Sequence, residues 1–389
     1  MRLGGKIQAS APYVVWIFYG YSVLHYSVEI RSGGHSFKTG DWLLNYSGGP
    51  IRRGLVGALL QYFSGIGVPL LWATFVLQVV VMGALFGIVL KIYKLRSRSN
   101  LWLLILFSPA FLLFPFYDLN GGFRKEILGL TIFAYACLIY AQNSVTRMKL
   151  VAVVLCFAFA SFSHEVTVFM LPLFTCLAFR FRDKGLIKTN EFVVFTSMMA
   201  VIGAASLGFA LLYSGGPRVT EVICKSLTGQ GLDPTICNGA IAWSADDFVT
   251  SVARVGDMLG IGSLSVPLLL LIALTPLFFT SFFDARMSLW FGVALITLAP
   301  LFVVAIDWGR WVYVAVFLVF CLALSEEVAI TRKFTRVQAF LGVVYLISWS
   351  IPHCCVGGGA QLGVDDFGQG LAVRVAMRVS DLFEKGWTL

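Results

Sequence analysis

Long apolar runs separated by short polar stretches dominate the sequence, and their lengths predict membrane-spanning helices. A helix needs about 20 largely apolar residues to cross the hydrocarbon core of a bilayer. Runs close to this length occur around residues 11–27, 67–90, 101–117, 127–142, 150–163, 166–180, 191–213, 264–283, 287–306, 311–325 and 337–352. The pattern therefore predicts an all-α polytopic integral membrane protein with about 11 transmembrane helices.

The composition supports the same fold class. Of 389 residues, 58% are hydrophobic and only 13% are charged, and the mean hydropathy is +0.85. Such values exclude an ordinary soluble globular protein. We expect one transmembrane helical domain over residues 1–370, with outer loops at 28–66 and 214–264. Residues 371–389 alternate apolar and charged faces, which predicts a C-terminal amphipathic helix on the membrane surface or capping the bundle.

The basic residues indicate the orientation of the chain. Their clusters lie at residues 91–98, 147–149, 180–188 and 332–336, which fall on alternate loops. Cytoplasmic loops carry such an excess of Lys and Arg. We therefore expect a cytoplasmic N-terminus, with the first apolar run retained as a helix. The net charge of +9 then follows from topology and indicates no nucleic-acid partner.

Two shorter features interrupt this plan. Residues 51–66 are apolar but too short and Gly-rich to span, so a re-entrant or interfacial helix is expected there. Residues 161–165 separate two apolar runs and predict either a tight helical hairpin or one interrupted pair of helices that dips below the membrane surface. Cys224 and Cys237 both lie in the long second outer loop, where a disulfide between them is compatible with an oxidising exterior.

Charged residues that the basic clusters do not explain collect on the predicted outer face. They are Asp41, Arg52, Arg53, Asp118, Arg124, Lys125, Glu126, His164, Glu165, Asp307, Arg310 and His353. Isolated interfacial anchors would be single Lys or Arg residues. A set that mixes acids and bases close to the ends of spans indicates a functional cavity.

Two Gly-Gly turns within this set are followed, one or two residues later, by paired cations. Residues 48–53 end in Arg52 and Arg53, and residues 120–125 end in Arg124 and Lys125. Cations in the first turn of a helix are unfavourable unless an anion accompanies them, and guanidinium groups bind phosphate bidentately. A substrate phosphate site is therefore predicted at these four residues. Simple snorkelling of the side chains remains the alternative.

Asp41, Glu165 and His164 are the candidates for catalysis. A carboxylate in a partly desolvated cavity can have a pKa raised toward neutrality and can then remove a proton from a hydroxyl group. Asp41 could instead cap a helix that begins at Trp42. His164 and Glu165 could instead form a hydrogen-bonded structural hairpin.

The remaining charged residues are expected to have supporting roles. Asp307 and Arg310 are three residues apart, so in a helix they would form an ion pair; binding of a substrate phosphate by Arg310 is the second interpretation. Asp118 and Glu126 are interpreted as structural, like Asp307. No His/Cys spacing typical of a metal site occurs on the outer face, and no Gly-Lys-Ser/Thr nucleotide loop occurs anywhere.

The chain has many spans without a nucleotide-sugar domain, Asp41 in the first outer loop, outer arginines (Arg52, Arg53, Arg124, Arg310) and a large late outer loop. Together these features resemble those of bacterial envelope glycosyltransferases. The resemblance is to Wzy-type O-antigen or capsule polymerases and to GT-C-fold enzymes that use polyprenyl-phosphate-linked sugars. It implies a GT-C-like or Wzy-like bundle in the bacterial inner membrane that transfers glycans on the periplasmic side.

The same resemblance implies the partners of the chain. These are a polyprenyl-(pyro)phosphate-linked glycan donor and acceptor, the lipid bilayer, and a chain-length regulator or other envelope assembly proteins. No cofactor is implied, and a requirement for a divalent metal stays open. The alternatives are a flippase or transporter of lipid-linked oligosaccharide, which should show an internal repeat, and a membrane acyltransferase that uses His164.

Overall fold

The computed structural model describes residues 3–96, 101–330, 335–355 and 367–384, and within these ranges the regular structure is helical with no β-strand. The longer helices are α1 (Leu3–Arg31), α3 (Gly54–Gly65), α4 (Leu70–Arg96), α7 (Ile127–Ala141), α8 (Arg147–Ser163), α10 (Leu171–Asp183), α11 (Thr189–Leu212), α12 (Pro217–Gly229), α14 (Phe248–Asp257), α15 (Ser265–Leu274), α16 (Ala285–Val304), α17 (Trp308–Ser325), α18 (Arg336–Ile347) and α19 (Leu371–Glu384). The short ones are α2 (Gly40–Leu43), α5 (Leu101–Leu106), α6 (Phe114–Tyr117), α9 (Val166–Phe169), η1 (Pro234–Asn238), α13 (Ala240–Trp243), η2 (Ile261–Leu264) and η3 (Thr275–Phe279).

Within the described part of the chain, five helical segments are long and apolar enough to cross a membrane, as judged by length and composition. They are Leu70–Arg96, Thr189–Leu212, Ile261–Phe279, Ala285–Val304 and Trp308–Ser325. The prediction of a helical membrane protein is confirmed at this level. The larger number of spans expected from the sequence is not reached by this criterion, because several apolar runs fold as shorter or broken helices.

Residues 101–117 give the clearest difference from expectation. Instead of one spanning helix, they form α5 and α6 with an irregular turn between them. Pro109 disfavours helical geometry at the residue before it and lacks an N–H donor. The hydroxyl of Ser108 then accepts a hydrogen bond from the backbone N–H of Ala110 at 3.3 Å and stabilises the turn. Hydropathy alone could not reveal this break.

The hairpin expected near residues 161–165 is confirmed. Helix α8 ends at Ser163, and the chain reverses through α9 into α10. The ring of Phe157 on α8 meets the ring of Phe174 on α10 edge-on, with centroids 5.5 Å apart. The turn therefore joins two helices that meet through these rings.

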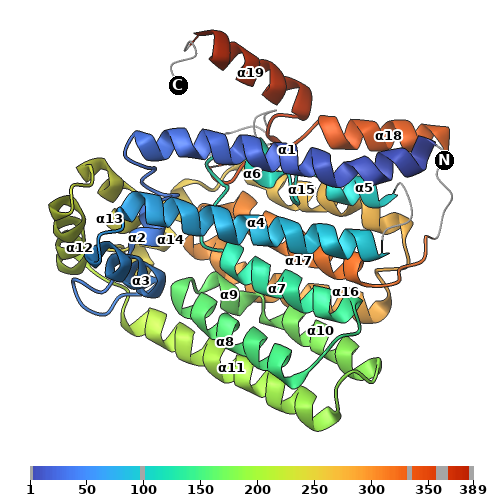
Figure 1. The fold of residues 1–389 in the computed structure, drawn as a ribbon, viewed down its shortest axis with the longest axis horizontal. Helices are drawn as coiled ribbons and strands as arrows, with labels where there is room; N and C mark the ends of the chain where they lie inside the picture. The colour runs from blue at the N-terminus through green and yellow to red at the C-terminus, as the bar shows by residue number, and fades with distance from the viewer. Residues whose placement is uncertain (1–2, 97–100, 331–334, 356–366, 385–389) are drawn as a thin grey trace.

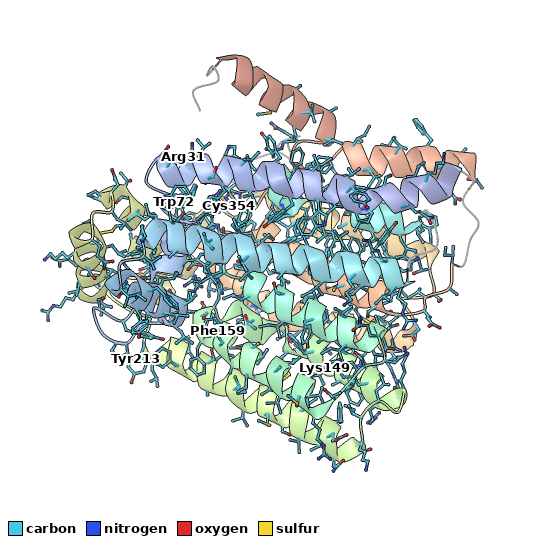
Figure 2. The ribbon with its side chains drawn as sticks, viewed as in Figure 1. Arg31, Trp72, Lys149, Phe159, Tyr213 and Cys354 are labelled. Carbon is cyan, nitrogen blue, oxygen red and sulfur yellow. A yellow bond between two sulfur atoms is a disulfide. The ribbon has the colours of Figure 1, made fainter. Side chains whose placement is uncertain are left out.

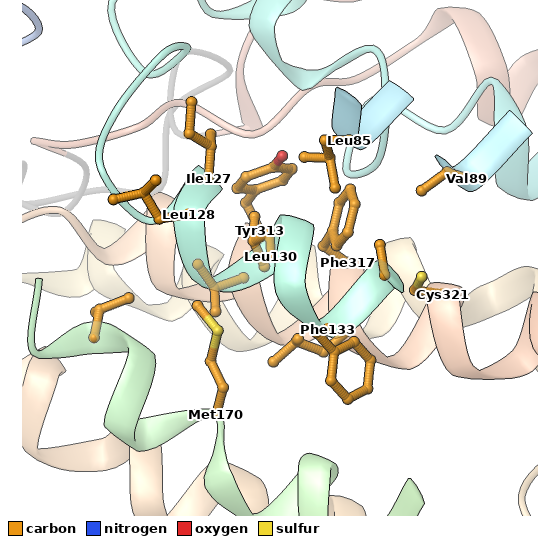
Figure 3. Packing of buried hydrophobic residues seen from close by; sticks show 14 of the residues in the cluster. Leu85, Val89, Ile127, Leu128, Leu130, Phe133, Met170, Tyr313, Phe317 and Cys321 are labelled. Carbon is orange, nitrogen blue, oxygen red and sulfur yellow. The ribbon is translucent and has the colours of Figure 1, made fainter. Parts of the chain in front are cut away.

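The core of the molecule lies around α17. Every residue of α17 is buried, because α4, α7, α10, α15 and α16 all contact it. Figure 3 shows this packing, with Leu85 and Val89 from α4 and Phe133 from α7 lying close to Phe317 and Cys321 from α17. An apolar helix enclosed in this way contributes its whole surface to packing with other helices, and the lipid meets the helices around it.

The helices of the two expected outer loops gather at one end of the long ones. In Figure 1, α2, α3, α12, α13 and α14 lie together at the left, where α1 and α11 end and α4 begins. Figure 2 places Arg31, Trp72 and Tyr213 at this same end and Lys149 toward the other. We call this the cavity end, and we call the opposite end, where α8 begins, the basic end.

The first expected outer loop contacts both the second one and the residue just before it at the cavity end. The backbone N–H of Ala240 donates to the carbonyl of Ser36 at 3.2 Å, and that of Arg52 donates to the carbonyl of Tyr213 at 2.8 Å. A disulfide joins Cys224 on α12 to Cys237 in η1, which confirms the predicted pair. The segment from α12 to α14 is thus tied both to itself and to the first loop.

The interfacial helix expected over residues 51–66 corresponds to α3, and the C-terminal helix corresponds to α19. In the second case the expected segment extends to residue 389, and its last five residues lie outside the described part of the chain. Figure 1 shows α19 beyond α1 and α18, outside the packed helices.

Candidate functional site

A cavity opens at the cavity end, between the bundle and the segment from α13 to α14. It encloses about 810 Å³, part of which is open to solvent. Five arginines and three aspartates line it: Arg52, Arg53, Arg124, Arg254, Arg310, Asp41, Asp246 and Asp307. The cavity also meets the side chains of His164, Phe37, Trp243 and Trp311. Most of the predicted site residues therefore do meet in one place.

Asp41 lies on the bundle side of this cavity. It belongs to the first turn of α2, whose N-cap is Thr39, so the alternative that Asp41 caps a helix is wrong. Its side chain is buried, yet neither carboxylate oxygen accepts a hydrogen bond from any residue that the structure describes. The nearest cations are Arg53 Nη1 and Lys125 Nζ, each 3.9 Å from Oδ1.

The electrostatic surroundings of Asp41 keep it ionised. Burial by itself raises the pKa of the carboxyl group, but the positive charges of Lys125 and Arg53 outweigh burial, and the pKa lies below its usual range. The expectation of a pKa raised toward neutrality was therefore wrong. A buried carboxylate without donors is costly, so its free oxygens are suited to accept a hydrogen bond from a ligand hydroxyl group.

Arg53 is held in place by Glu165. Its Nε donates to the two carboxylate oxygens of Glu165 at 3.0 and 2.8 Å, and Nη2 contacts the same carboxylate. Arg53 has a positive φ of 64°, and its carbonyl accepts a hydrogen bond from Lys125 Nζ at 2.8 Å. These contacts fix the turn before α3 and commit Glu165 to an ion pair, unlike Asp41, whose two oxygens accept no hydrogen bond from the described residues.

His164 lies beside this pair, at the break between α8 and α9. Its Nδ1 accepts a hydrogen bond from the backbone N–H of Val166 at 3.2 Å. Burial, together with the charge of Arg53, lowers the pKa of His164 to about 4. The imidazole is therefore neutral at pH 7. Its Nδ1 serves the structural hairpin that the sequence offered as one alternative, while the ring still lines the cavity.

Arg310 is engaged by two acids. Its Nε and Nη2 donate to the two oxygens of Glu126 at 2.9 and 2.7 Å, and Nη1 lies 3.1 Å from Asp307 Oδ2. The ion pair expected from the three-residue spacing of Asp307 and Arg310 is confirmed. Because both acids neutralise the guanidinium, this geometry favours the structural interpretation of Arg310 over phosphate binding.

Arg124 and Arg52 are the lining cations that lack such partners. Arg124 Nε donates to the carbonyl of Asn120 at 3.0 Å, and its guanidinium lies 5.6 Å from the ring centre of Phe37. Neither arginine forms an ion pair with a carboxylate in the described part of the chain, and no side-chain hydrogen bond of Arg52 occurs there. Both remain available to an anion in the cavity.

Asp118 stabilises the Gly-Gly turn that precedes Arg124. It accepts hydrogen bonds from the backbone N–H groups of Asn120 and Gly121 at 3.1 and 2.8 Å. His353 Nδ1 lies 2.8 Å from Oδ2. Burial raises the pKa of Asp118, but the bonds from His353 and the backbone lower it to about 2 overall. Asp118 thus fixes the Gly-Gly turn that positions Arg124, in keeping with its predicted structural role.

Three further residues that line the cavity could not be singled out from the sequence. Trp243, Asp246 and Arg254 come from the second expected outer loop. Arg254 Nη1 donates to Asp246 Oδ2 at 2.6 Å. Eight residues separate the two, across the start of α14, so no helical spacing rule would have paired them. An Asp-Asp pair beside a Trp was the available signal, and it was a weak one.

No group of three or more His, Cys, Asp or Glu side chains is placed to hold a metal ion within the described ranges. Comparisons of the chain with protein-family models, with characterised proteins and with solved structures give no match. The function must therefore be argued from the cavity itself. Its buried free carboxylate and unpaired guanidiniums can together accept a proton and stabilise an anion.

Proposed function

We propose that the chain is a membrane glycosyltransferase or polysaccharide polymerase that uses polyprenyl-(pyro)phosphate-linked sugar donors at the periplasmic face of a bacterial inner membrane. The observation that carries the proposal is the cavity lined by both Asp41, whose carboxylate oxygens accept no hydrogen bond from the described residues, and Arg124, which has no carboxylate partner among them. Glycosyl transfer from a lipid phosphate needs both a proton acceptor and a site for the leaving phosphate.

In the proposed reaction, a hydroxyl oxygen of the acceptor glycan attacks the anomeric carbon of the donor. The new C–O bond forms as the bond from the anomeric carbon to the phosphate oxygen breaks, and the polyprenyl (pyro)phosphate leaves with that electron pair. The hydroxyl proton passes to the carboxylate of Asp41. Because this carboxylate is ionised and lacks internal donors, it can bind the attacking hydroxyl before transfer occurs.

Charge on the leaving group is stabilised by Arg52 and Arg124 in this proposal. Negative charge develops on the phosphate as the bond breaks, and fixed guanidiniums at that point favour the transition state over the ground state. Arg53 and Lys125 have a different role in the proposed reaction. Lys125 donates to the carbonyl of Arg53, Arg53 is paired with Glu165, and the two cations keep Asp41 ionised.

The test is an assay of the purified protein reconstituted in liposomes with a short-chain polyprenyl-pyrophosphate oligosaccharide from the host, with products separated as a ladder on a gel. We expect wild type to give product and Asp41→Asn and Arg124→Gln to lower the rate by about 10²-fold or more. Arg147→Gln, at the basic end, is the matched control and should keep the wild-type rate.

Two outcomes would overturn the proposal. Wild-type rates in both Asp41→Asn and Arg124→Gln would remove the site from the reaction. Absence of product, combined with movement of labelled lipid-linked oligosaccharide across the liposome membrane, would favour the flippase alternative, in which the same arginines would bind the phosphate headgroup.

A further inference from the structure

We propose that the wall formed by Trp243, Asp246 and Arg254 is a carbohydrate subsite, which binds a glycosyl ring next to the reacting centre. The inference rests on the proposed function. It adds the place where the sugar binds, as distinct from the phosphate. The three residues come from the α13–α14 segment and line the cavity.

The chemistry of this wall is that of hydroxyl recognition. Arg254 and Asp246 form a pair of planar polar groups, joined at 2.6 Å, in which the other carboxylate oxygen of Asp246 keeps its acceptor capacity. Their side chains retain 33% and 20% exposure. Adjacent hydroxyl groups of a sugar match such a pair, because each hydroxyl can both donate to a carboxylate and accept from a guanidinium.

Trp243 supplies the apolar part of the wall. The Arg254 guanidinium lies 4.1 Å from its ring centre, and Phe37 meets the ring edge-on with centroids 4.9 Å apart. Despite these neighbours, Trp243 stays 36% exposed. An exposed indole beside planar polar groups suits a ligand with one apolar face and a polar rim, and a sugar ring has both.

Charge divides the cavity between two parts of one substrate. Asp246 neutralises Arg254, whereas Arg52 and Arg124 have no carboxylate partner among the described residues. A phosphate is therefore drawn to Arg52 and Arg124, and a neutral glycosyl ring fits the paired Asp246 and Arg254. Asp41 and Arg124 both line the same cavity.

The wall is also held firmly enough to position a ligand. Asp247 caps α14 by accepting a hydrogen bond from the N–H of Thr250 at 2.7 Å, so the neighbouring Asp246 is not used as the cap. A Cβ at Gly239 would lie 2.6 Å from the backbone of Ser36, which shows how closely the segment packs on the first loop. The Cys224–Cys237 disulfide ties the residues just before this contact.

The experiment measures glycan and lipid binding separately, with the full-length protein in nanodiscs. The probes are an array of phosphate-free bacterial surface oligosaccharides and, in a second measurement, undecaprenyl phosphate without sugar. We expect wild type to bind at least one glycan, and Trp243→Leu and Asp246→Asn each to weaken that binding about tenfold. Undecaprenyl phosphate should bind these two variants with the same affinity as wild type. It should bind Arg124→Gln more weakly.

Trp72→Leu is the matched control, because Trp72 is 41% exposed at the same end of the molecule but does not line the cavity. Equal losses in Trp72→Leu and Trp243→Leu, or no glycan bound by wild type above empty nanodiscs, would overturn the subsite. Glycan binding that depends on Trp243 without any glycosyl transfer would leave the subsite standing and remove the proposed function instead.

Discussion

Ion pairs at the two ends of the molecule use the same chemistry in different surroundings. At the cavity end, Arg310 and Glu126 are 5% and 1% exposed and form a bidentate pair. At the basic end, the Arg147 side chain is 84% exposed and forms a single contact with Glu191 at 3.0 Å. Helix α8 alone, with 17 residues, separates Arg147 from the cavity by roughly 25 Å.

The difference lies in what the loss of one partner would cost. An exposed pair contributes about 0–1 kcal/mol, since water replaces either partner. A buried pair that loses one member leaves an uncompensated charge, which costs about 3–5 kcal/mol. The cavity end is therefore a set of charges that depend on one another, whereas the Arg147–Glu191 pair at the basic end is individually dispensable. Four measurements test this contrast.

The largest effect is expected from removing one member of the buried pair. Arg310→Met should lower the free energy of unfolding by about 3–5 kcal/mol, because Glu126 stays buried without its partner. Arg147→Met at the basic end should change it by less than about 1 kcal/mol. Thermal unfolding in detergent compares the two. Similar losses in both variants would show that burial does not distinguish the two ends.

The disulfide gives the next largest effect. Cys224→Ser, which opens the link to Cys237, should destabilise the α12–α14 segment by about 2–4 kcal/mol, because the unfolded segment gains freedom. Limited trypsin digestion should then cleave faster at Arg218 and Lys225. Cleavage at Lys149, at the basic end, is the internal control. Unchanged cleavage at all three sites would show that contacts with the first loop suffice to hold the segment.

A single methyl group on α3 should have a smaller effect. A Cβ at Gly57 would lie 1.9 Å from the carbonyl oxygen of Leu44, so Gly57→Ala should push α3 from α2 at a cost of about 1–3 kcal/mol. At Gly65, on the same helix, a Cβ would meet nothing within 4 Å. Gly65→Ala should therefore leave thermal stability equal to wild type or higher. The reverse order would contradict the close contact between α2 and α3.

The smallest effect concerns pH. The folded-state pKa of His164 is lowered to about 4 from a usual value near 6.5, so between these values the unfolded chain binds more protons than the folded one. Stability must then fall as the pH falls through this window. From pH 7.5 to 5.5 the contribution of His164 is about 1 kcal/mol. Thermal unfolding of wild type and His164→Gln at both pH values should show a smaller loss in the variant.

The sequence predicted the long helices correctly where an apolar run is long and uninterrupted. The runs at 67–90, 191–213 and 287–306 became α4, α11 and α16, because a long uninterrupted apolar segment has few alternatives to a helix in a membrane. The run at 101–117 was misjudged because proline geometry, which a hydropathy average ignores, broke it.

For the candidate site, the sequence predicted the members better than their partners. Asp41, Arg53 and Arg124 were expected on one face, and they do line one cavity. That Glu126 would bind Arg310, 184 residues away, could not be read from local spacing, because only tertiary packing joins them. The pKa of Asp41 was misjudged for the same reason, since the cations that lower it come from other segments.

The burial of α17 also has a consequence for biosynthesis. Its neighbours α4, α7 and α10 are all made before it, and α16 ends only four positions before α17 begins. When synthesis of α16 has just ended, the space that α17 occupies in the folded protein is therefore still empty, and Glu126 lacks its partner Arg310. Insertion of α17 fills this space and neutralises the Glu126 carboxylate at the same time. A chain cut short before residue 308 would expose both the empty space and the unpaired carboxylate to the quality-control proteases of the membrane.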